Sequence, residues 1–276
     1  MTRAQALADF QTALHISHSQ IFTYLGCSLK YRFQYVEQRP PERISIALPF
    51  GSAVHSGIER FYRSIKDKGV VEPLETIQEV FENRLTVELD KREVPILYKK
   101  ETPDRDGAIE MGKGLLKAFY EGIDLSGFEV VDVELPLTAR LYNEDGQPTD
   151  LMVTGILDVV LKDAVGNIIA VDNKTAKQPY AQESVDEDLQ LSSYAYLLAA
   201  NRFVPATADV YGRFDVMRKL KTPKFEQHYT IRTAAHRRRF AKIANAVLAG
   251  IDARVFIPCK SWLCGDCQYA KACGEW

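Results

Sequence analysis

The chain has 276 residues, of which 46% are hydrophobic and 26% are charged, the balance of an ordinary globular protein. Its 35 Lys and Arg residues against 37 Asp and Glu residues give a formal net charge of -2, which excludes a wholly basic, histone-like coat protein. At roughly 150 residues per domain, this length allows one large domain with additions. The longest apolar run, Tyr194 to Ala200, is far below the roughly 18 residues of a membrane helix, so we expect no membrane partner.

The cysteines and the start of the chain favour a reducing, cytoplasmic location. There are five cysteines, and four of them lie between Cys259 and Cys273, which is a poor framework for disulfides. The stretch from Met1 to Asp9 contains an acidic residue and no apolar signal core, so we expect no secretory leader.

The first part of the chain, up to about residue 125, is predicted to be mostly helical. Ser17 can cap a helix that runs as far as Leu29, because serine oxygens accept hydrogen bonds from the free N–H groups at a helix start. Further stretches repeat the apolar spacing of a helix. They are residues 51–62, 73–90 and 107–122.

The middle of the chain is rich in Val, Ile, Tyr and Phe, which predicts strands. The predicted strands are residues 128–137, 151–161, 168–173, 208–216 and 226–231. Helices are expected at about 185–201 and 233–251. We therefore predict an α/β fold in one compact unit. Its parts are a helical N-terminal part (1–126), a mixed β-sheet core flanked by helices (127–250) and a cysteine-rich tail (251–276).

The predicted hairpin in this core is the most informative segment. Asp172 and Lys174 point to the same side of their strand, because strand side chains alternate. If the turn is symmetric about Val165, Asp158 faces Asp172, and opposed residues lie about 4.5–5.5 Å apart. Two opposed carboxylates repel each other unless a positive charge lies between them, and hard oxygen ligands suit Mg²⁺ or Mn²⁺. The alternative is a surface hairpin whose Asp and Lys side chains are merely solvated.

Three residues outside the hairpin are candidates for the same site. His55 lies beside the apolar stripe of its helix, where it is either a third metal ligand or a hydrogen-bonded residue at the core boundary. Gln190 and Tyr194 lie four residues apart and share one helix face.

The terminal cysteines indicate a second, separate metal centre. In Cys264-x2-Cys267-x5-Cys273, the two-residue gap lets both thiolates reach one metal. A fourth thiolate can come from Cys259, which is near in sequence, or from the distant Cys27. Zinc and an iron–sulfur cluster both accept four thiolates, and the spacing does not choose between them.

A basic block lies between Arg213 and Lys242, where ten basic residues face only Asp215 and Glu226, a balance of +8. This excess indicates a groove that contacts nucleic-acid phosphates; the alternative is a solvated strand and helix. The ten residues are Arg213, Arg218, Lys219, Lys221, Lys224, Arg232, Arg237, Arg238, Arg239 and Lys242.

Taken in chain order, these pieces resemble the RecB-type nucleases of the PD-(D/E)XK superfamily, in the subgroup with a 4Fe–4S cluster. CRISPR-associated RecB-like nucleases and the nuclease domain of AddB belong to that subgroup. The matching motifs are Ser17-x-Ser19 with Tyr24-x2-Cys27, Gly51-x3-His55, Gly155-x2-Asp158, Asp172-x-Lys174-Thr175, Gln190-x3-Tyr194 and the terminal cysteine motif. The resemblance implies a restriction-endonuclease-like fold.

The resemblance also implies the ligands of the catalytic Mg²⁺ or Mn²⁺. They are His55, Asp158, Asp172 and the backbone carbonyl of Asn173, whose side chain is expected to face away from the metal. Glu134 matches a carboxylate that some members use for a second metal.

The remaining implied roles concern catalysis and the cluster. Lys174 would orient or help deprotonate the attacking water and stabilise charge on the phosphate, while Gln190 and Tyr194 would line the site. The implied cluster ligands are Cys27, Cys264, Cys267 and Cys273, which leaves Cys259 as a spare thiol.

The function that follows from the resemblance is metal-dependent hydrolysis of DNA by a single-stranded DNA exonuclease. It would act in DNA repair, recombination or CRISPR and phage DNA processing, with protein partners from a repair or CRISPR complex. One alternative is a non-catalytic DNA-binding adaptor subunit of a recombination or CRISPR integration complex, which the intact motif residues disfavour. The other is a zinc-ribbon protein with an unrelated α/β domain.

Overall fold

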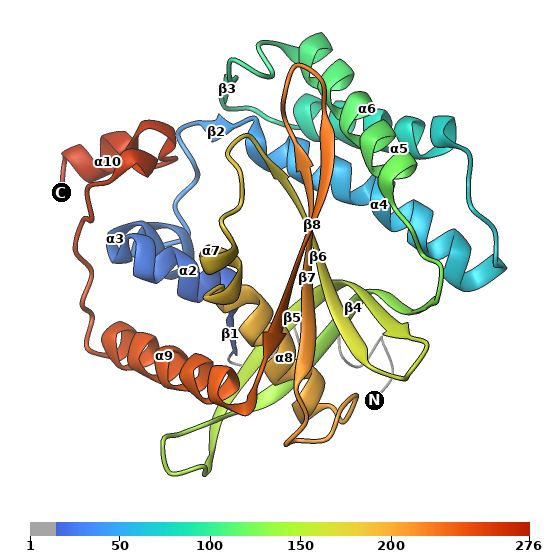
Figure 1. Ribbon diagram of the computed structural model, residues 1–276. Helices are drawn as coiled ribbons and strands as arrows, with labels where there is room; N and C mark the ends of the chain where they lie inside the picture. Colours follow the sequence, from blue (N-terminus) through green and yellow to red (C-terminus); the bar gives the residue numbers. More distant parts are fainter. Residues whose placement is uncertain (1–14) are drawn as a thin grey trace.

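The structure is a computed structural model that describes residues 15–276, so the stretch from Met1 to Asp9 lies outside the described residues. A six-stranded mixed sheet runs through the centre, with helices on both of its faces (Figure 1). Its strands are β1 (His15–Ser17), β4 (Phe128–Tyr142), β5 (Pro148–Asp163), β6 (Ile168–Ala176), β7 (Val210–Arg218) and β8 (Lys224–Arg232). The predicted α/β fold with a mixed sheet is thereby confirmed.

The sheet is organised around the long strand β5. One edge of β5 pairs with β4 in antiparallel fashion, and the other edge pairs first with β1, in parallel, and then with β6. From β6 the sheet continues to β7, in parallel, and then to the antiparallel β8. Outside the main sheet, β2 (Ile44–Ser45) and β3 (Ile96–Leu97) form a short parallel pair.

The turn between β5 and β6 fixes the register of the hairpin. The Asp163 side chain accepts hydrogen bonds from the backbone N–H groups of Val165 (3.0 Å) and Asn167 (2.8 Å). Gly166 has a φ of 95°, a conformation that favours glycine. The pairing of Val159 with Val171 confirms that the hairpin is symmetric about Val165.

The helices form two layers, one on each face of the sheet (Figure 1). One layer is α4 (Ala47–Lys68), α5 (Leu74–Asp90) and α6 (Arg105–Gly122), and the other is α2 (His18–Gly26), α8 (Leu189–Ala200) and α9 (Ala234–Asp252). Strand side chains alternate between the two cores, as β6 illustrates: Ala170 joins the α8 and α9 core, while Ile169 and Val171 join the α4 to α6 core. None of the helices within residues 15–276 is long and apolar enough to cross a membrane.

Most predicted elements form, with a few changes at their ends. The helix expected to reach Leu29 ends at Gly26, because Cys27 is extended at φ -167°, and Leu29 belongs to the next helix, α3 (Ser28–Tyr31). The helix expected at 185–201 is divided into α7 (Gln182–Asp186) and α8, because the Asp188 side chain caps α8 by accepting from the backbone N–H of Leu191.

The basic block does not form one exposed groove, so this prediction is wrong in part. Four of its ten members are buried: Arg213, Arg218, Arg232 and Arg237. Arg213 is 0% exposed and holds Asp215 through two contacts of 2.8 Å. The reason is its position on β7, an interior strand of the sheet, where a guanidinium must find its partners inside the protein.

Two of the other buried arginines satisfy backbone carbonyls instead. Arg237 donates to the carbonyls of Ala206 (2.7 Å) and Ala208 (2.9 Å), and Arg232 donates to the carbonyls of Val185 and Asp186 at the end of α7. Arg232 therefore ties the end of α7 to β8, and Arg237 ties the loop before β7 to α9. The exposed basic residues of the block are Lys221, Lys224, Arg238, Arg239 and Lys242.

We expect Arg213→Ala to lower the free energy of unfolding by about 3–5 kcal/mol, because it leaves the Asp215 carboxylate buried without its partner. Arg239→Ala, at an exposed position of the same block, should change stability by no more than about 0.5 kcal/mol. Urea unfolding followed by circular dichroism measures both variants. Equal stability of the two would contradict a structural role for Arg213.

Candidate active site

The site begins where β5 and β6 diverge beyond their last pair, Val159 and Val171. Asp158 and Asp172 are the next residues on these strands. The Asp158 Oδ2 atom accepts a hydrogen bond from the backbone N–H of Asn173 at 2.8 Å. The side-chain amide of Asn173 also lies 3.4 Å from that oxygen, so the expectation that this side chain faces away is wrong. Its amide therefore helps to hold the carboxylate.

His55 reaches this point from α4, on one face of the sheet. Its Nε2 atom lies 2.7 Å from the carbonyl oxygen of Asn173, and its Nδ1 atom lies 3.3 Å from Oδ2 of Asp158. Burial lowers the pKa of His55, but the charges of Asp158 and Asp172 outweigh it and the net pKa is raised. Because Nε2 donates to a carbonyl, Nδ1 faces the carboxylate, an arrangement that requires either a proton or a cation between them.

Glu134 joins this group from β4. The pairs on either side, Val133 with Val159 and Leu135 with Leu157, place Glu134 across from Asp158. Its φ of 49° is a left-handed conformation that non-glycine residues seldom adopt, and such strain concentrates at functional sites.

The group has the composition of a metal site. The ligand atoms of His55, Glu134 and Asp158 all lie within 4.8 Å of one another. The family resemblance implied that Glu134 holds a second metal, and the structure places its carboxylate near the ligand atoms of His55 and Asp158. One imidazole and two carboxylates suit a divalent cation such as Mn²⁺ or Mg²⁺.

Both carboxylates of this group hold their protons more tightly than usual. Burial, followed by the charge of Asp158, raises the pKa of Glu134 to about 7. Burial also raises the pKa of Asp158 to about 6, against the opposing effect of His55. A bound divalent cation would remove this cost by stabilising the ionised forms.

Asp172 belongs to a second, adjoining set of contacts that includes α8. Lys174 Nζ lies 2.7 Å from one Asp172 oxygen and donates to Gln190 Oε1, also at 2.7 Å. Gln190 Nε2 donates to the other Asp172 oxygen at 2.6 Å, and the Tyr194 hydroxyl lies 3.0 Å from it. Burial lowers the pKa of Lys174, but Asp172 outweighs it and the net pKa is raised, so the amine is charged. All the residues expected at the catalytic site are thus brought together.

Gly155 explains how α8 comes so close to β5. A Cβ atom at this position would lie 2.8 Å from a Leu197 methyl carbon of α8, closer than real contacts allow. The absence of a side chain therefore lets Tyr194 reach the carbonyl of Ile156 at 3.0 Å, beside the carboxylates.

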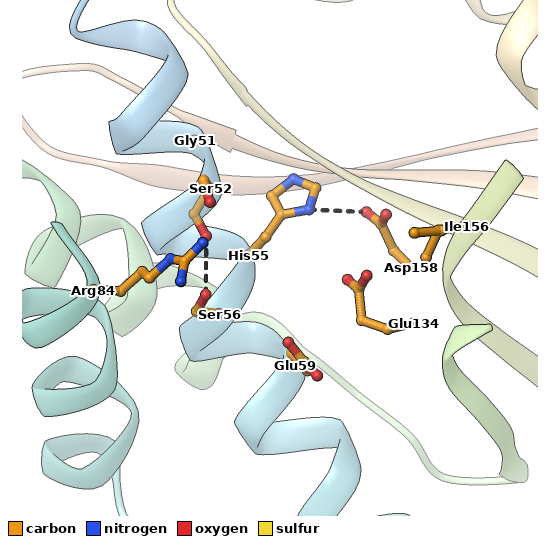
Figure 2. A pocket seen from close by; sticks show the side chains of 9 residues that line it. All are labelled: Gly51, Ser52, His55, Ser56, Glu59, Arg84, Glu134, Ile156 and Asp158. Carbon is orange, nitrogen blue, oxygen red and sulfur yellow. Dashed lines mark hydrogen bonds and ion pairs between the residues drawn. The ribbon is translucent and has the colours of Figure 1, made fainter. Parts of the chain in front are cut away.

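A cavity of about 450 Å³ opens over the His55, Glu134 and Asp158 group (Figure 2). Glu59 and Arg84 also line it, and sequence reasoning missed both. The spacing of Glu59, one helical turn after His55, is a signal that could have been used. Arg84 on α5 offers no such signal, because its position depends on how α5 packs against α4.

The cysteine-rich tail docks against the segment that follows α2. The backbone N–H of Leu29 donates to the carbonyl of Ile257 at 3.1 Å, and the Ile257 N–H donates to the Ser28 hydroxyl at 2.8 Å. Farther along, the Glu42 carboxylate accepts from the N–H groups of Lys271 and Ala272, both at 2.9 Å. Residues more than 220 positions apart are thereby held side by side.

This docking gathers the thiols of four cysteines, and the backbone N–H of the fifth, Cys259, lies 3.5 Å from the Cys27 sulfur. Cys27, Cys267 and Cys273 pack around a small apolar cluster of Leu29, Phe33 and Tyr269. Burial raises the pKa of the Cys273 thiol, and the neighbouring thiols of Cys27, Cys267 and Cys264 raise it further. All five cysteines are free thiols. The distant Cys27 is therefore brought to the terminal motif, as the spacing argument allowed.

Comparison with known proteins identifies the family. Residues 15–274 match the model of the PD-(D/E)XK nuclease superfamily, whereas no curated protein matches the chain. Among solved structures, a protein from Eubacterium rectale described as a putative exonuclease is similar over 100% of this chain and 92% of its own, with 10% identity and a TM-score of 0.59. The structure of a protein designated SSO0001 is 12% identical over 90% of this chain and 94% of its own, with a TM-score of only 0.39.

The site and the fold therefore define a nuclease, a hydrolase of phosphodiester bonds. The chain belongs to the PD-(D/E)XK nuclease superfamily, whose members use divalent metals, and its sheet has the restriction-endonuclease-like fold of that superfamily. The group of His55, Glu134 and Asp158 supplies a place for such a metal.

We expect Glu134→Gln to stabilise the metal-free protein at alkaline pH. In the wild type, the raised pKa of Glu134 gives stability that is present below pH 4.5 and is lost as the pH rises through about 7. With allowance for solvent screening, the variant should gain about 1 kcal/mol at pH 8, or about 2–4 °C in melting temperature, and nothing at pH 4.5.

Thermal melts in a chelator at pH 4.5 and pH 8 test this expectation. Glu144→Gln, at an exposed position, is the matched control and should melt like the wild type at both values. If Glu134→Gln melts no higher than the wild type at pH 8, ionisation of the Glu134 carboxylate does not destabilise the folded protein.

Proposed function

We propose that the chain is a metal-dependent deoxyribonuclease of the RecB-like subgroup, and that it degrades single-stranded DNA as an exonuclease. The observation that carries the proposal is the meeting of His55, Glu134 and Asp158 beside a charged Lys174, at the floor of an open cavity. The similarity in fold to the Eubacterium rectale protein, which is described as a putative exonuclease, agrees with this proposal. We place the activity in the cytoplasm, in repair, recombination or CRISPR and phage DNA processing, with protein partners from such a complex.

The residues present fit a catalytic divalent cation. His55, Glu134 and Asp158 would hold it, with Asp172 and the carbonyl of Asn173 next to them. When bound, the cation polarises the phosphoryl oxygen and lowers the pKa of a coordinated water.

Residues on the other side of the carboxylates position the charge that the reaction needs. Lys174 places an ammonium where negative charge grows on the phosphate, which stabilises the transition state more than the ground state. Gln190 accepts a hydrogen bond from Lys174 and donates one to Asp172, and the Tyr194 hydroxyl donates to the same Asp172 oxygen. The completeness of this set supports a catalytic protein over a DNA-binding adaptor.

The tail fits a 4Fe–4S cluster ligated by Cys27, Cys264, Cys267 and Cys273, with Cys259 spare. The charges of the Cys27, Cys267 and Cys264 thiols act on the Cys273 thiol, so these four thiols lie near enough to one another to serve one centre. The choice of a cluster over a single zinc follows from the resemblance to the RecB-like subgroup.

We expect the wild type to degrade end-labelled single-stranded DNA with Mg²⁺ or Mn²⁺. Asp158→Asn and Lys174→Ala should each lower kcat by a factor of about 100 or more, because they remove a metal ligand and the charge beside the phosphate. Asp150→Asn, an exposed position on the same strand as Asp158, should keep full activity.

The digestion is run with the label at the 5′ end and at the 3′ end, so that end-dependent loss of nucleotides separates exonuclease from endonuclease cleavage. Tight DNA binding without cleavage under all metal conditions would point to an adaptor. Activity on RNA alone would overturn the assignment to DNA.

We expect Cys264→Ala to yield a colourless protein without bound iron and with reduced solubility, because the tail loses its anchor to Cys27. Activity should fall secondarily, with thermal stability. Cys259→Ala should retain the visible absorption of an iron–sulfur protein and its iron content. Wild-type protein that is colourless and loaded with zinc after anaerobic purification would contradict the cluster assignment.

A further inference from the structure

We propose that Arg84, with the first turns of α4, forms a binding site for the DNA phosphate next to the one that is cleaved. This inference rests on the proposed nuclease function and assigns a role to a residue that no sequence motif marks. The cavity of about 450 Å³ has the His55, Glu134 and Asp158 group on one side and Arg84 on the other (Figure 2). That volume is of the size that small-molecule sites enclose, and it leaves room for one nucleotide between the two sides.

The charges around the cavity explain why such a residue is needed. Three carboxylates line it, those of Glu59, Glu134 and Asp158, and together they repel an approaching phosphate chain. Of the described residues that line the cavity, Arg84 is the one with a permanent positive charge. A cation at the metal site would attract the scissile phosphate, whereas Arg84 lies on the opposite wall and would attract its neighbour.

The wall beside Arg84 is open and polar. Figure 2 shows the guanidinium facing the turn of α4 that carries Ser52 and Ser56. Ser52 is exposed, and a Cβ atom added at Gly51 would meet nothing within 4 Å, so no side chain blocks the approach. A planar guanidinium binds phosphate oxygens in pairs, and the Ser52 hydroxyl can donate to the same oxygens, whereas the Ser56 hydroxyl donates to the Ser52 carbonyl at 3.1 Å.

The ion pair between Arg84 and Glu88 can break at little cost in stability. Arg84 lies 3.1 Å from Glu88, one helical turn away, and its side chain is 47% exposed. Exposed pairs of this kind contribute little to stability. Glu88 is also bound by Arg92 at 2.7 Å, so its charge stays compensated when Arg84 turns toward a phosphate.

This shared carboxylate supplies a matched control. Arg84→Ala and Arg92→Ala each remove one of the two partners of Glu88, at exposed or half-buried positions of the same region. Only Arg84 lines the cavity. A purely structural role of the ion pairs would affect both variants alike, whereas a phosphate site affects Arg84→Ala alone.

The experiment is steady-state cleavage of labelled single-stranded DNA with Mn²⁺ by the wild type and both variants. Arg84→Ala should raise KM about tenfold with kcat nearly unchanged, Arg84→Lys should restore part of the loss, and Arg92→Ala should match the wild type. The slope of log KM against log salt should fall by about 0.7 for Arg84→Ala, the value for one lost phosphate contact on a single strand.

A second substrate locates the contact. A single neutral methylphosphonate placed next to the scissile phosphate should weaken cleavage by the wild type and have no added effect on Arg84→Ala. Equal kinetics of Arg84→Ala and Arg92→Ala, or full methylphosphonate sensitivity in Arg84→Ala, would overturn the inference. A wild type without nuclease activity would instead overturn the proposed function itself, so the two failures are distinguishable.

Discussion

Three buried or half-buried carboxylates, those of Glu134, Asp158 and Asp172, lie close together at the end of the β5–β6 hairpin. The cost of ionising them there determines which groups must surround them. Burial, followed by the charge of Asp158, raises the pKa of Glu134, and burial together with the charge of Asp172 raises the pKa of Asp158. Two cationic groups, His55 and Lys174, lie on opposite sides of the carboxylates and offset part of this cost. A divalent cation would supply the remaining positive charge. Without the cation the arrangement costs stability, and with it the same arrangement is suited to phosphodiester hydrolysis.

The sheet topology makes this convergence possible. Since β5 lies between β4 and β6, three adjacent strands deliver one carboxylate each: those of Glu134 and Asp158 to one group and that of Asp172 to the adjoining set of contacts. Helix α4 delivers His55 from one face, and α8 delivers Gln190 and Tyr194 from the other. Both helices belong to well-packed cores, so the side chains that surround the charges are fixed before any metal or substrate arrives.

The sequence predicted those parts of the site that depend on local geometry. Asp158 and Asp172 could be paired because one turn, symmetric about Val165, fixes their register. The place of Glu134 could not be derived in the same way, because bulges shift the β4–β5 register on both sides of it, near Val130 and near Arg140. Composition also misjudged the basic block, since counting charges does not reveal which of them find partners inside the protein.

Helix α2 links the catalytic residues to the cysteine-rich tail. Helix α2 starts at His18, whose pKa is lowered to about 4 by burial and then by the charge of Lys174, so its first turn adjoins the catalytic residues. The same helix ends at Gly26, directly before Cys27 and the docked tail. A cluster bound there would therefore be linked to the surroundings of Lys174 through a single short helix. Its loss would loosen the chain termini first and disturb the chemistry only through α2, because no cysteine touches the carboxylates themselves within residues 15–276.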